Sequence, residues 1–251
     1  MRPRWRWASG RSIRRGEAGK PSGAGPLRRA VTMSQGCLPC PLCGSGAEHL
    51  LDATVCGRAR SYYRCPECLL IHVPRAQHVD AASERAVYDE HDNAVDDPGY
   101  RRFLSRVLEP LLAEAAPPGR ALDFGCGPGP ALAAMLEEAG FETALYDPFY
   151  YPDPAPLAET YDIVTTTEVL EHLADPAAEL ARLWGCVRPG GRLGVMTKRQ
   201  PEPGVFARWH YLHDPTHVAF YHDETFRWLA ARWDAELEMP RGDVALLRKR
   251  A

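Results

Sequence analysis

Apolar residues in the second half of the chain fall into short runs of strand length, separated by stretches with helical spacing. The runs lie at 120–124, 141–147, 161–164 and 193–196, with a further pair of short strands around Arg241 and Gly242. Amphipathic helices are indicated at 131–140, from near Asp175 onward, and at 224–233. Strands that alternate with helices predict an α/β fold on a mostly parallel sheet.

A separate helical pattern lies in residues 81–118. Apolar residues recur there at i, i+3 and i+4, at Phe103, Leu104, Val107, Leu108, Leu111 and Leu112. Pro110 is expected to kink this helix or to divide it in two. The preceding DDPGY, residues 96–100, reads as a surface loop or as a lid over a ligand. We therefore expect 81–118 to be a helical connector that packs on the next domain.

The charge is distributed unevenly along the 251 residues. The whole chain has 30 Lys and Arg against 33 Asp and Glu, a net charge of −3, but residues 1–32 carry +8 and the remainder −11. The basic segment 1–32 is expected to be a disordered tail, with Met33 as an alternative start, or else an RNA-binding or targeting arm. Because no apolar run approaches about 20 residues, a membrane-spanning protein is excluded.

Four of the eight cysteines have the spacing of a metal site. Cys40 and Cys43 form one CxxC, Cys65 and Cys68 form another, and 21 residues separate the two pairs. Two such pairs supply the four thiolates of a tetrahedral structural zinc, with no position left open for catalysis. Residues 33–80 are therefore predicted to form a small zinc ribbon around a short hairpin.

Other interpretations of these cysteines remain open. Cys37 could replace Cys40 or Cys43, because CLPC is also a CxxC. A disulfide framework or a redox CxxC is disfavoured, since no secretory signal is recognisable and no βαβ pattern surrounds either pair. We expect a cytoplasmic protein with its thiols reduced.

A glycine-rich turn follows the first predicted strand. The run RALDFGCGPGP places Asp123 before Gly125, Gly127 and Gly129, and the second strand ends at Asp147. Strand, glycine turn, helix, strand and acid form a nucleotide-binding βαβ unit. Pro130 stands where a dinucleotide-binding turn needs Gly or Ala, and Asp123 would repel a pyrophosphate.

This pattern resembles motif I of the class I S-adenosylmethionine-dependent methyltransferases, and the resemblance extends over about 119–251. It implies a Rossmann-like methyltransferase sheet with flanking helices, preceded here by the zinc ribbon. The Pro189-Gly190-Gly191 turn and the C-terminal hairpin are similar to later parts of the same fold. The segment between Asp147 and Tyr161 is too short and too rich in proline for the usual helix and third strand.

The resemblance also implies roles for single residues. S-adenosylmethionine would be the cofactor. Its methionine and ribose part would contact Asp123 and the three glycines, its ribose hydroxyls would contact Asp147, and its methyl group would lie near Thr167 and Glu168.

The segment EVLEHL introduces the chemistry of the acceptor. Glu168, Glu171 and His172 have i, i+3, i+4 spacing, and WHYLHDPTH later supplies His217 with His210, His213 and Asp214 nearby. The E-x-x-E-H pattern with a later His looks like the metal site of small-RNA 2′-O-methyltransferases and ubiquinone-pathway O-methyltransferases. Carried over, the ligands of a second divalent metal would be Glu168, Glu171, His172 and His217.

Two further interpretations of this group stay open. His172 or His217 could act as a general base without a metal, with Glu168 beside the methyl group. Alternatively, Glu171 and His172 could only order the cofactor loop. Aromatic residues in the same loops could line a pocket for a flat acceptor or hold the sulfonium, at Phe149, Tyr150, Tyr151, Trp209, Tyr211, Phe220 and Tyr221.

The methyl acceptor is the least determined part. Because the −11 body disfavours long nucleic acids, a small-molecule hydroxyl or carboxyl is expected first, RNA second and protein third. The rival from another class is a noncatalytic binding module, in which the ribbon docks a partner. Intact glycines and both acids argue against that rival.

Overall fold

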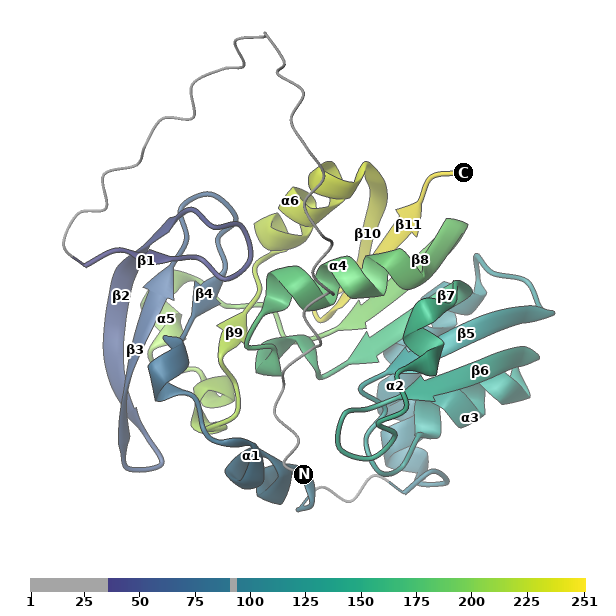
Figure 1. Cartoon of the computed structure of the whole chain (residues 1–251), viewed down its shortest axis with the longest axis horizontal. Helices are drawn as coiled ribbons and strands as arrows, with labels where there is room; N and C mark the ends of the chain where they lie inside the picture. Colours follow the sequence, from purple (N-terminus) through teal and green to yellow (C-terminus); the bar gives the residue numbers. More distant parts are fainter. Residues whose placement is uncertain (1–35, 91–93) are drawn as a thin grey trace, which may run out of the picture.

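A computed structural model describes residues 36–90 and 94–251, so the basic tail predicted at 1–32 lies outside the described residues. Most of the second half forms a six-stranded sheet in the order β10-β11-β8-β7-β5-β6 (Figure 1). Its strands are β5 (Gly119–Phe124), β6 (Phe141–Tyr146), β7 (Tyr161–Thr167), β8 (Val187–Met196), β10 (Ala235–Arg241) and β11 (Val244–Lys249). The four strands β8, β7, β5 and β6 are parallel, and the C-terminal hairpin pairs antiparallel with β8. The α/β sheet that the sequence predicts is confirmed.

Apolar cores cover both faces of this sheet because successive strand residues point to opposite sides. Ala121 packs with α2 (Pro98–Leu112) and α3 (Ala131–Glu138), whereas the next residue, Leu122, packs with α4 (Pro176–Cys186) and α6 (Asp223–Trp233). The strand ends that carry the polar residues are thus fixed by a core on either side.

The helix of the predicted connector starts earlier than expected. Asp97 caps its first turn by accepting the backbone N–H of Tyr100, and Pro98 occupies the first helical position. The DDPGY segment is therefore mostly the start of α2 and not a loop. Pro110 lies near the end of this helix without dividing it, because a proline there disturbs few hydrogen bonds.

Two details of the sheet follow from glycine and proline. The Pro189-Gly190-Gly191 segment forms a bulge inside β8, where Tyr161 pairs with Val187 but Ile163 pairs with Arg192. The short segment after Asp147 contains a 3₁₀ turn, Ala155–Ala158, and no strand, so the sheet lacks the third strand that the proline content disfavours.

The cysteine-rich segment forms a second, five-stranded sheet. It contains β1 (Leu38–Pro39), the long hairpin of β2 (Gly46–Val55) and β3 (Arg58–Arg64), and β4 (Ile71–His72). The fifth strand, β9 (Ala219–Phe220), comes from the C-terminal half and pairs with β4. The predicted hairpin is confirmed. The ribbon is nevertheless not closed by 33–80 alone, since its last strand follows far later in the sequence.

The ribbon also shares its apolar core with the large sheet. Cys68 and Leu70 are fully buried in the same cluster as Tyr221 and Phe226. A 3₁₀ turn (Arg75–Gln77) and helix α1 (Ala81–Tyr88) lead from the ribbon toward α2 (Figure 1). Helix α5 (Pro203–Phe206) and the 3₁₀ turns Leu170–His172 and His210–His213 complete the described elements. Of the helices described, none combines the length and the apolar character needed to span a bilayer.

Candidate functional site

A cavity of about 370 Å³ opens where β5, β6 and β7 end, which is the edge where parallel α/β sheets bind their ligands. Both predicted groups of residues contribute to its wall. The cofactor group supplies Gly125, Gly127, Asp147 and Thr167, and the acceptor group supplies Glu168, Glu171, His172 and His217. These eight predicted residues come from four separate stretches of the sequence and meet at one cavity.

The glycine turn after β5 requires glycine for two reasons. Gly125 and Gly127 have φ values of 75° and 65°, in the left-handed region that other residues rarely adopt. In addition, a Cβ atom on Gly125 would lie 2.3 Å from Cγ2 of Val169. The backbone of this turn therefore comes directly against the loop after β7. Gly129, the third predicted glycine, is in the turn but not on the cavity wall.

Asp147 binds two loops together at the cavity. Its Oδ2 accepts the N–H of Gly127 at 3.0 Å, and its Oδ1 accepts the N–H groups of Phe149 at 2.8 Å and Tyr150 at 3.1 Å. Since three backbone donors stabilise this carboxylate, its position is fixed before any ligand arrives.

Asp123 is placed differently from the expectation. Its side chain is 2% exposed, does not line the cavity, and accepts a hydrogen bond at 2.9 Å from Oγ1 of Thr165. Burial, with Asp147 adding repulsion, raises the pKa of Asp123 to about 7. The acid before the first glycine thus lies inside the fold, where it is hydrogen-bonded to the neighbouring strand β7.

Glu168 directly follows β7 in a conformation unusual for its type. Its φ is 51°, and its backbone N–H donates to Met196 of the neighbouring strand at 2.7 Å. Burial and the nearby Glu171 raise the pKa of Glu168 to about 8. Oε1 is buried without a hydrogen-bond partner among the described residues, although the side chain lines the cavity. Strained, buried polar groups of this kind are typical of functional sites.

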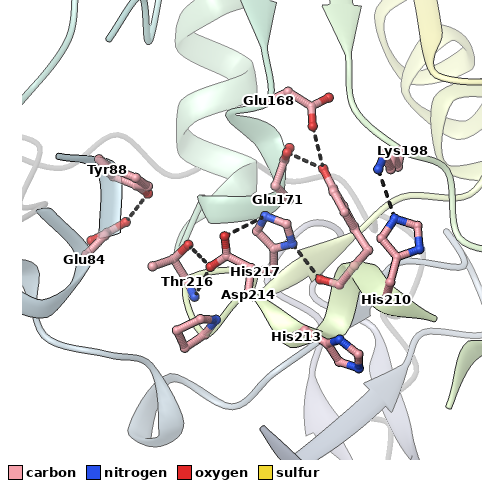
Figure 2. A network of polar contacts seen from close by, with 12 residues as sticks. Glu84, Tyr88, Glu168, Glu171, Lys198, His210, His213, Asp214, Thr216 and His217 are labelled. Atoms are coloured by element: carbon pink, nitrogen blue, oxygen red, sulfur yellow. Dashed lines mark hydrogen bonds and ion pairs between the residues drawn. The ribbon is translucent and has the colours of Figure 1, made fainter. Parts of the chain in front are cut away.

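Glu171 is the fixed centre of the acceptor group. It is fully buried, and its two oxygens accept hydrogen bonds from the hydroxyls of Tyr211 and of Thr197, the latter at 2.8 Å. The same phenol oxygen lies 3.3 Å from Oε2 of Glu168, so one hydroxyl contacts both carboxylates. Figure 2 shows these carboxylates on the same side of the network.

The two imidazoles stand beside Glu171. The rings of His172 and His217 are 4.8 Å apart, and one ligand atom from each of Glu171, His172 and His217 lies within 4.8 Å of the others. Burial lowers the pKa of His172 to about 4, so its ring is neutral at pH 7. His217 Nδ1 lies 2.7 Å from the carbonyl oxygen of Tyr211, which can only accept. In the neutral ring this contact places the proton on Nδ1 and leaves Nε2 with a lone pair.

Glu168 does not belong to this tight group. Its carboxylate is held near Glu171 through Tyr211, but the three mutually close ligand atoms come from Glu171, His172 and His217. Of the four predicted ligands, three therefore have closely spaced ligand atoms, whereas Glu168, with its left-handed φ of 51°, lies outside that group of three.

Two histidines of the later segment lie away from the cavity wall. His210 is exposed, with its Nε2 3.1 Å from Nζ of Lys198, and His213 is exposed as well (Figure 2). Of the aromatic residues expected in the pocket, only Phe149 and Tyr150 line it. Trp209, Tyr211, Phe220 and Tyr221 pack in the apolar cores, and Tyr151 pairs through its backbone with Asp147.

Sequence reasoning missed three aromatic residues of the wall: Tyr88, Tyr100 and Phe103. They come from α1 and α2. The ring of Tyr88 makes edge contacts with Phe149 at 5.7 Å and with His172 at 5.2 Å. The helices of the connector thus form part of the site. Tyr100 and Phe103 do show helical spacing, but that spacing alone could not distinguish a cavity from a core.

The four ribbon cysteines converge as the spacing predicts. Sγ of Cys40 is 3.6 Å from Sγ of Cys68, and Sγ of Cys43 is 3.4 Å from Sγ of Cys65. A tetrahedron with metal–sulfur distances of about 2.3 Å has edges of about 3.8 Å. All four sulfurs lie within 4.8 Å of one another, and Cys37 is not in the group.

Comparison with known proteins identifies the family. The methyltransferase domain family matches residues 98–238, more than half of the chain. A ubiquinone biosynthesis O-methyltransferase of Stutzerimonas stutzeri is 29% identical over 102 residues, covering 40% of this chain and 44% of that protein. A trans-aconitate 2-methyltransferase of Deinococcus radiodurans is 31% identical over 113 residues, covering 38% and 43%. The chain spans less than half the length of these curated relatives.

Solved structures are similar to the chain at lower identity. A 1,6-didemethyltoxoflavin-N1-methyltransferase of Burkholderia thailandensis is 18% identical with a TM-score of 0.45, covering 80% of this chain and 99% of that one. Human N-acetylserotonin methyltransferase is 17% identical with a TM-score of 0.43, covering 61% and 56%. Because this family model matches more than half of the chain, the chain belongs to the methyltransferase domain family.

Proposed function

We propose that the protein methylates an oxygen of a small-molecule acceptor, with a hydroxyl group as the first candidate. One observation carries this proposal: Glu171, His172 and His217 converge in the cavity whose opposite wall is the cofactor turn. Methyl transfer from a sulfonium is an in-line displacement, so donor and acceptor must be held in line. An oxygen nucleophile additionally reacts faster once it has lost its proton. Glu171, His172 and His217 could remove that proton or bind a metal that lowers its pKa.

The cofactor half of the cavity suits S-adenosylmethionine. Gly125 and Gly127 allow the ligand to approach the backbone closely, and Asp147 is preorganised to accept from the ribose hydroxyls. Thr167 ends β7 on the cavity wall, where the methyl group would face the acceptor. Asp123 would act indirectly, through the turn that follows it.

A divalent metal fits the acceptor half. Glu171 supplies a carboxylate and His172 a neutral imidazole, and Nε2 of His217 carries a lone pair while Nδ1 is held by a carbonyl. When bound, the metal would lower the pKa of an acceptor hydroxyl. Nδ1 of His172 is buried without a hydrogen-bond partner among the described residues, which agrees with a ligand role. Glu168 would lie beside the acceptor and not on the metal.

The same residues also allow a route without metal. His217, with its free Nε2 facing Asp214 at 3.6 Å, can accept the acceptor's proton, and the carboxylate can stabilise the resulting imidazolium. Figure 2 shows Asp214 beside His217, held in turn by Thr216. Both routes place His217 at the acceptor. A chelator distinguishes them, because it should reduce the rate of methyl transfer only in the metal-dependent route.

The ribbon cysteines fit a structural zinc. Two of the sulfur pairs are 3.6 and 3.4 Å apart, close to the edge of a zinc tetrahedron, and a metal bound by all four thiolates has no open position for a substrate. We assign this metal to Cys40, Cys43, Cys65 and Cys68 and give it no part in the chemistry.

Names of relatives support a small acceptor. The curated relatives include enzymes named for ubiquinone biosynthesis and for trans-aconitate. In addition, no Lys or Arg from the described part of the chain lines the cavity, which disfavours a polyanionic acceptor such as RNA.

The test is methyl transfer from radiolabelled S-adenosylmethionine to small phenols, catechols and carboxylic acids, with small amines, RNA and protein assayed in parallel. Labelled O-methyl product is expected with wild-type protein, and Glu171→Gln and His217→Gln should each reduce its rate by about 100-fold or more. His213→Gln is the matched control, because His213 is exposed and off the cavity wall. The proposal would be abandoned if only RNA, protein or amine acceptors were labelled, or if Glu171→Gln and His217→Gln kept the wild-type rate.

A further inference from the structure

We infer that Arg60 of the ribbon is a positioning residue for the acceptor site, and that the ribbon thereby forms a structural half of that site. Arg60 lies on β3, 157 residues before His217 and the loop that carries it. Its Nη1 donates to the backbone carbonyl of His217 at 2.9 Å, and its Nη2 donates to the carbonyl of Pro215. One guanidinium therefore holds both ends of the short turn that presents His217. This inference rests on the proposed role of His217.

The burial of Arg60 indicates that its hydrogen bonds to Pro215 and His217 are not incidental surface contacts. Its side chain is 3% exposed, and no carboxylate in residues 36–90 or 94–251 forms an ion pair with it. Burying a cation is unfavourable unless its donors are satisfied. Here the carbonyls of Pro215 and His217 supply the acceptors, so the loop that carries His217 and the arginine stabilise each other.

Further contacts connect the ribbon with the same loop. β4 pairs with β9 directly after His217, and the N–H of Val73 donates to the carbonyl of Val218 at 2.9 Å. The N–H of Val218 in turn donates to the carbonyl of Glu171 at 2.7 Å. The backbone thus forms a continuous path from the ribbon through Val218 to the two acceptor residues.

Geometry explains why arginine serves here. The two carbonyls accept from the two terminal nitrogens of one planar guanidinium, which holds several donors in a fixed geometry, whereas an ammonium offers a single nitrogen. Arg60→Met would keep most of the buried volume and remove both hydrogen bonds. Arg60→Lys would keep the charge but could satisfy the two carbonyls only in part.

The first measurement is the affinity of Mn²⁺ for the zinc-replete protein, followed by electron paramagnetic resonance. Mn²⁺ prefers carboxylate and imidazole over thiolates, so it reports on Glu171, His172 and His217 and not on the ribbon cysteines. Loss of an outer contact that orients a ligand typically reduces metal affinity by about 10- to 100-fold. We expect that loss in Arg60→Met and a smaller loss in Arg60→Lys. Arg58→Met, an exposed arginine on the same strand, should bind as wild type does.

The second measurement does not depend on a metal. In protein labelled with ¹⁵N-histidine at about pH 8.5, where an ordinary histidine is neutral, the signal of His217 should show the Nδ1–H tautomer in wild type. His217→Gln assigns this signal. Arg60→Met should lose the single tautomer while affinity for S-adenosylhomocysteine stays unchanged, which separates positioning from general unfolding.

The two readouts distinguish this inference from the proposed function. If wild-type protein takes up no Mn²⁺, the metal route fails, and the His217 signal alone then decides the role of Arg60. If Arg60→Met keeps the wild-type His217 signal, or binds Mn²⁺ as tightly as wild type, the positioning role is overturned. If Arg60→Met does not fold, the same comparison is made with Arg60→Lys.

Discussion

The carboxylate of Asp147 accepts the backbone N–H of Gly127 at 3.0 Å, so the acid at the end of β6 and the glycine turn after β5 are one unit. The same carboxylate holds the N–H groups of Phe149 and Tyr150. A residue expected to touch the ribose thus also shapes the loops around the cofactor. Removing the Asp147 carboxylate should therefore weaken cofactor binding twice, by loss of the ribose contact and by loss of the hydrogen bonds that hold the two loops.

Asp147→Ala should therefore weaken binding of S-adenosylhomocysteine strongly. Loss of a charge-assisted hydrogen bond typically costs about 1.5–3 kcal/mol, which is roughly 10- to 100-fold in affinity. Calorimetry on metal-replete protein measures the change. Asp153→Ala is the matched control, because Asp153 caps its own turn through Ala155 and does not line the cavity. Equal affinity in wild type and Asp147→Ala would remove Asp147 from the cofactor site.

The cofactor turn and Asp147 could be predicted because the signal is local. A strand, a glycine turn, a helix and a second strand determine the βαβ unit from about 30 consecutive residues, and Asp147 has its place at the end of that unit. The missing third strand was also readable from the prolines between Asp147 and Tyr161. Glu171, His172 and His217 were predicted from their residue types, which are those of metal and acid–base sites, and the fold brings them together at the cavity.

The rest depends on long-range packing that has no sequence pattern. The two residues of β9 are too few to show any period, yet they complete the ribbon sheet. The contacts of Arg60 and the place of Tyr88 over the cavity arise only when distant segments pack together. The left-handed backbone angle of Glu168 is likewise not indicated by its residue type.

Zinc content tests the ribbon. Wild-type protein should contain about one zinc per chain, and Cys40→Ser should lose it and unfold at a lower temperature, because small ribbons depend on their metal. Cys37→Ser is the control, since Cys37 is outside the group of four sulfurs. Because the ribbon shares a core with the large sheet, the loss should also destabilise the methyltransferase half. Metal analysis that found a folded, zinc-free wild type would contradict this assignment.

The buried Asp123 should make stability depend on pH. Its pKa is raised from 3.8 to about 7 in the folded protein. Because the pKa is raised in the folded state, the contribution of Asp123 to the free energy of unfolding is fully present below pH 3.8 and is lost as the pH rises to about 7. At about 1.4 kcal/mol per unit, the loss amounts to about 4 kcal/mol.

Asp123→Asn should consequently raise the free energy of unfolding, relative to wild type, more at pH 8 than at pH 5. The reason is that the amide stays neutral and can still accept from Thr165. Denaturant unfolding at the two pH values measures the difference. Asp96→Asn, an exposed change, should leave the pH dependence of wild type intact. If Asp123→Asn followed the wild-type pH dependence, Asp123 would not be the titrating group.

The approach of Gly125 to Val169 gives the last prediction. Gly125→Ala introduces a Cβ 2.3 Å from Cγ2 of Val169 and also a side chain at a φ of 75°. The clash costs about 1–3 kcal/mol and the left-handed backbone about 1–2 kcal/mol. Only the first of these can be relieved by a smaller neighbour. The double variant Gly125→Ala/Val169→Ala should therefore be less destabilised than the sum of the single variants, by about 1–3 kcal/mol in a double-mutant cycle. Gly204→Ala, which meets nothing within 4 Å, is the control for adding a methyl group. Additive single effects would mean that the turn and the loop carrying Glu168 are not in contact.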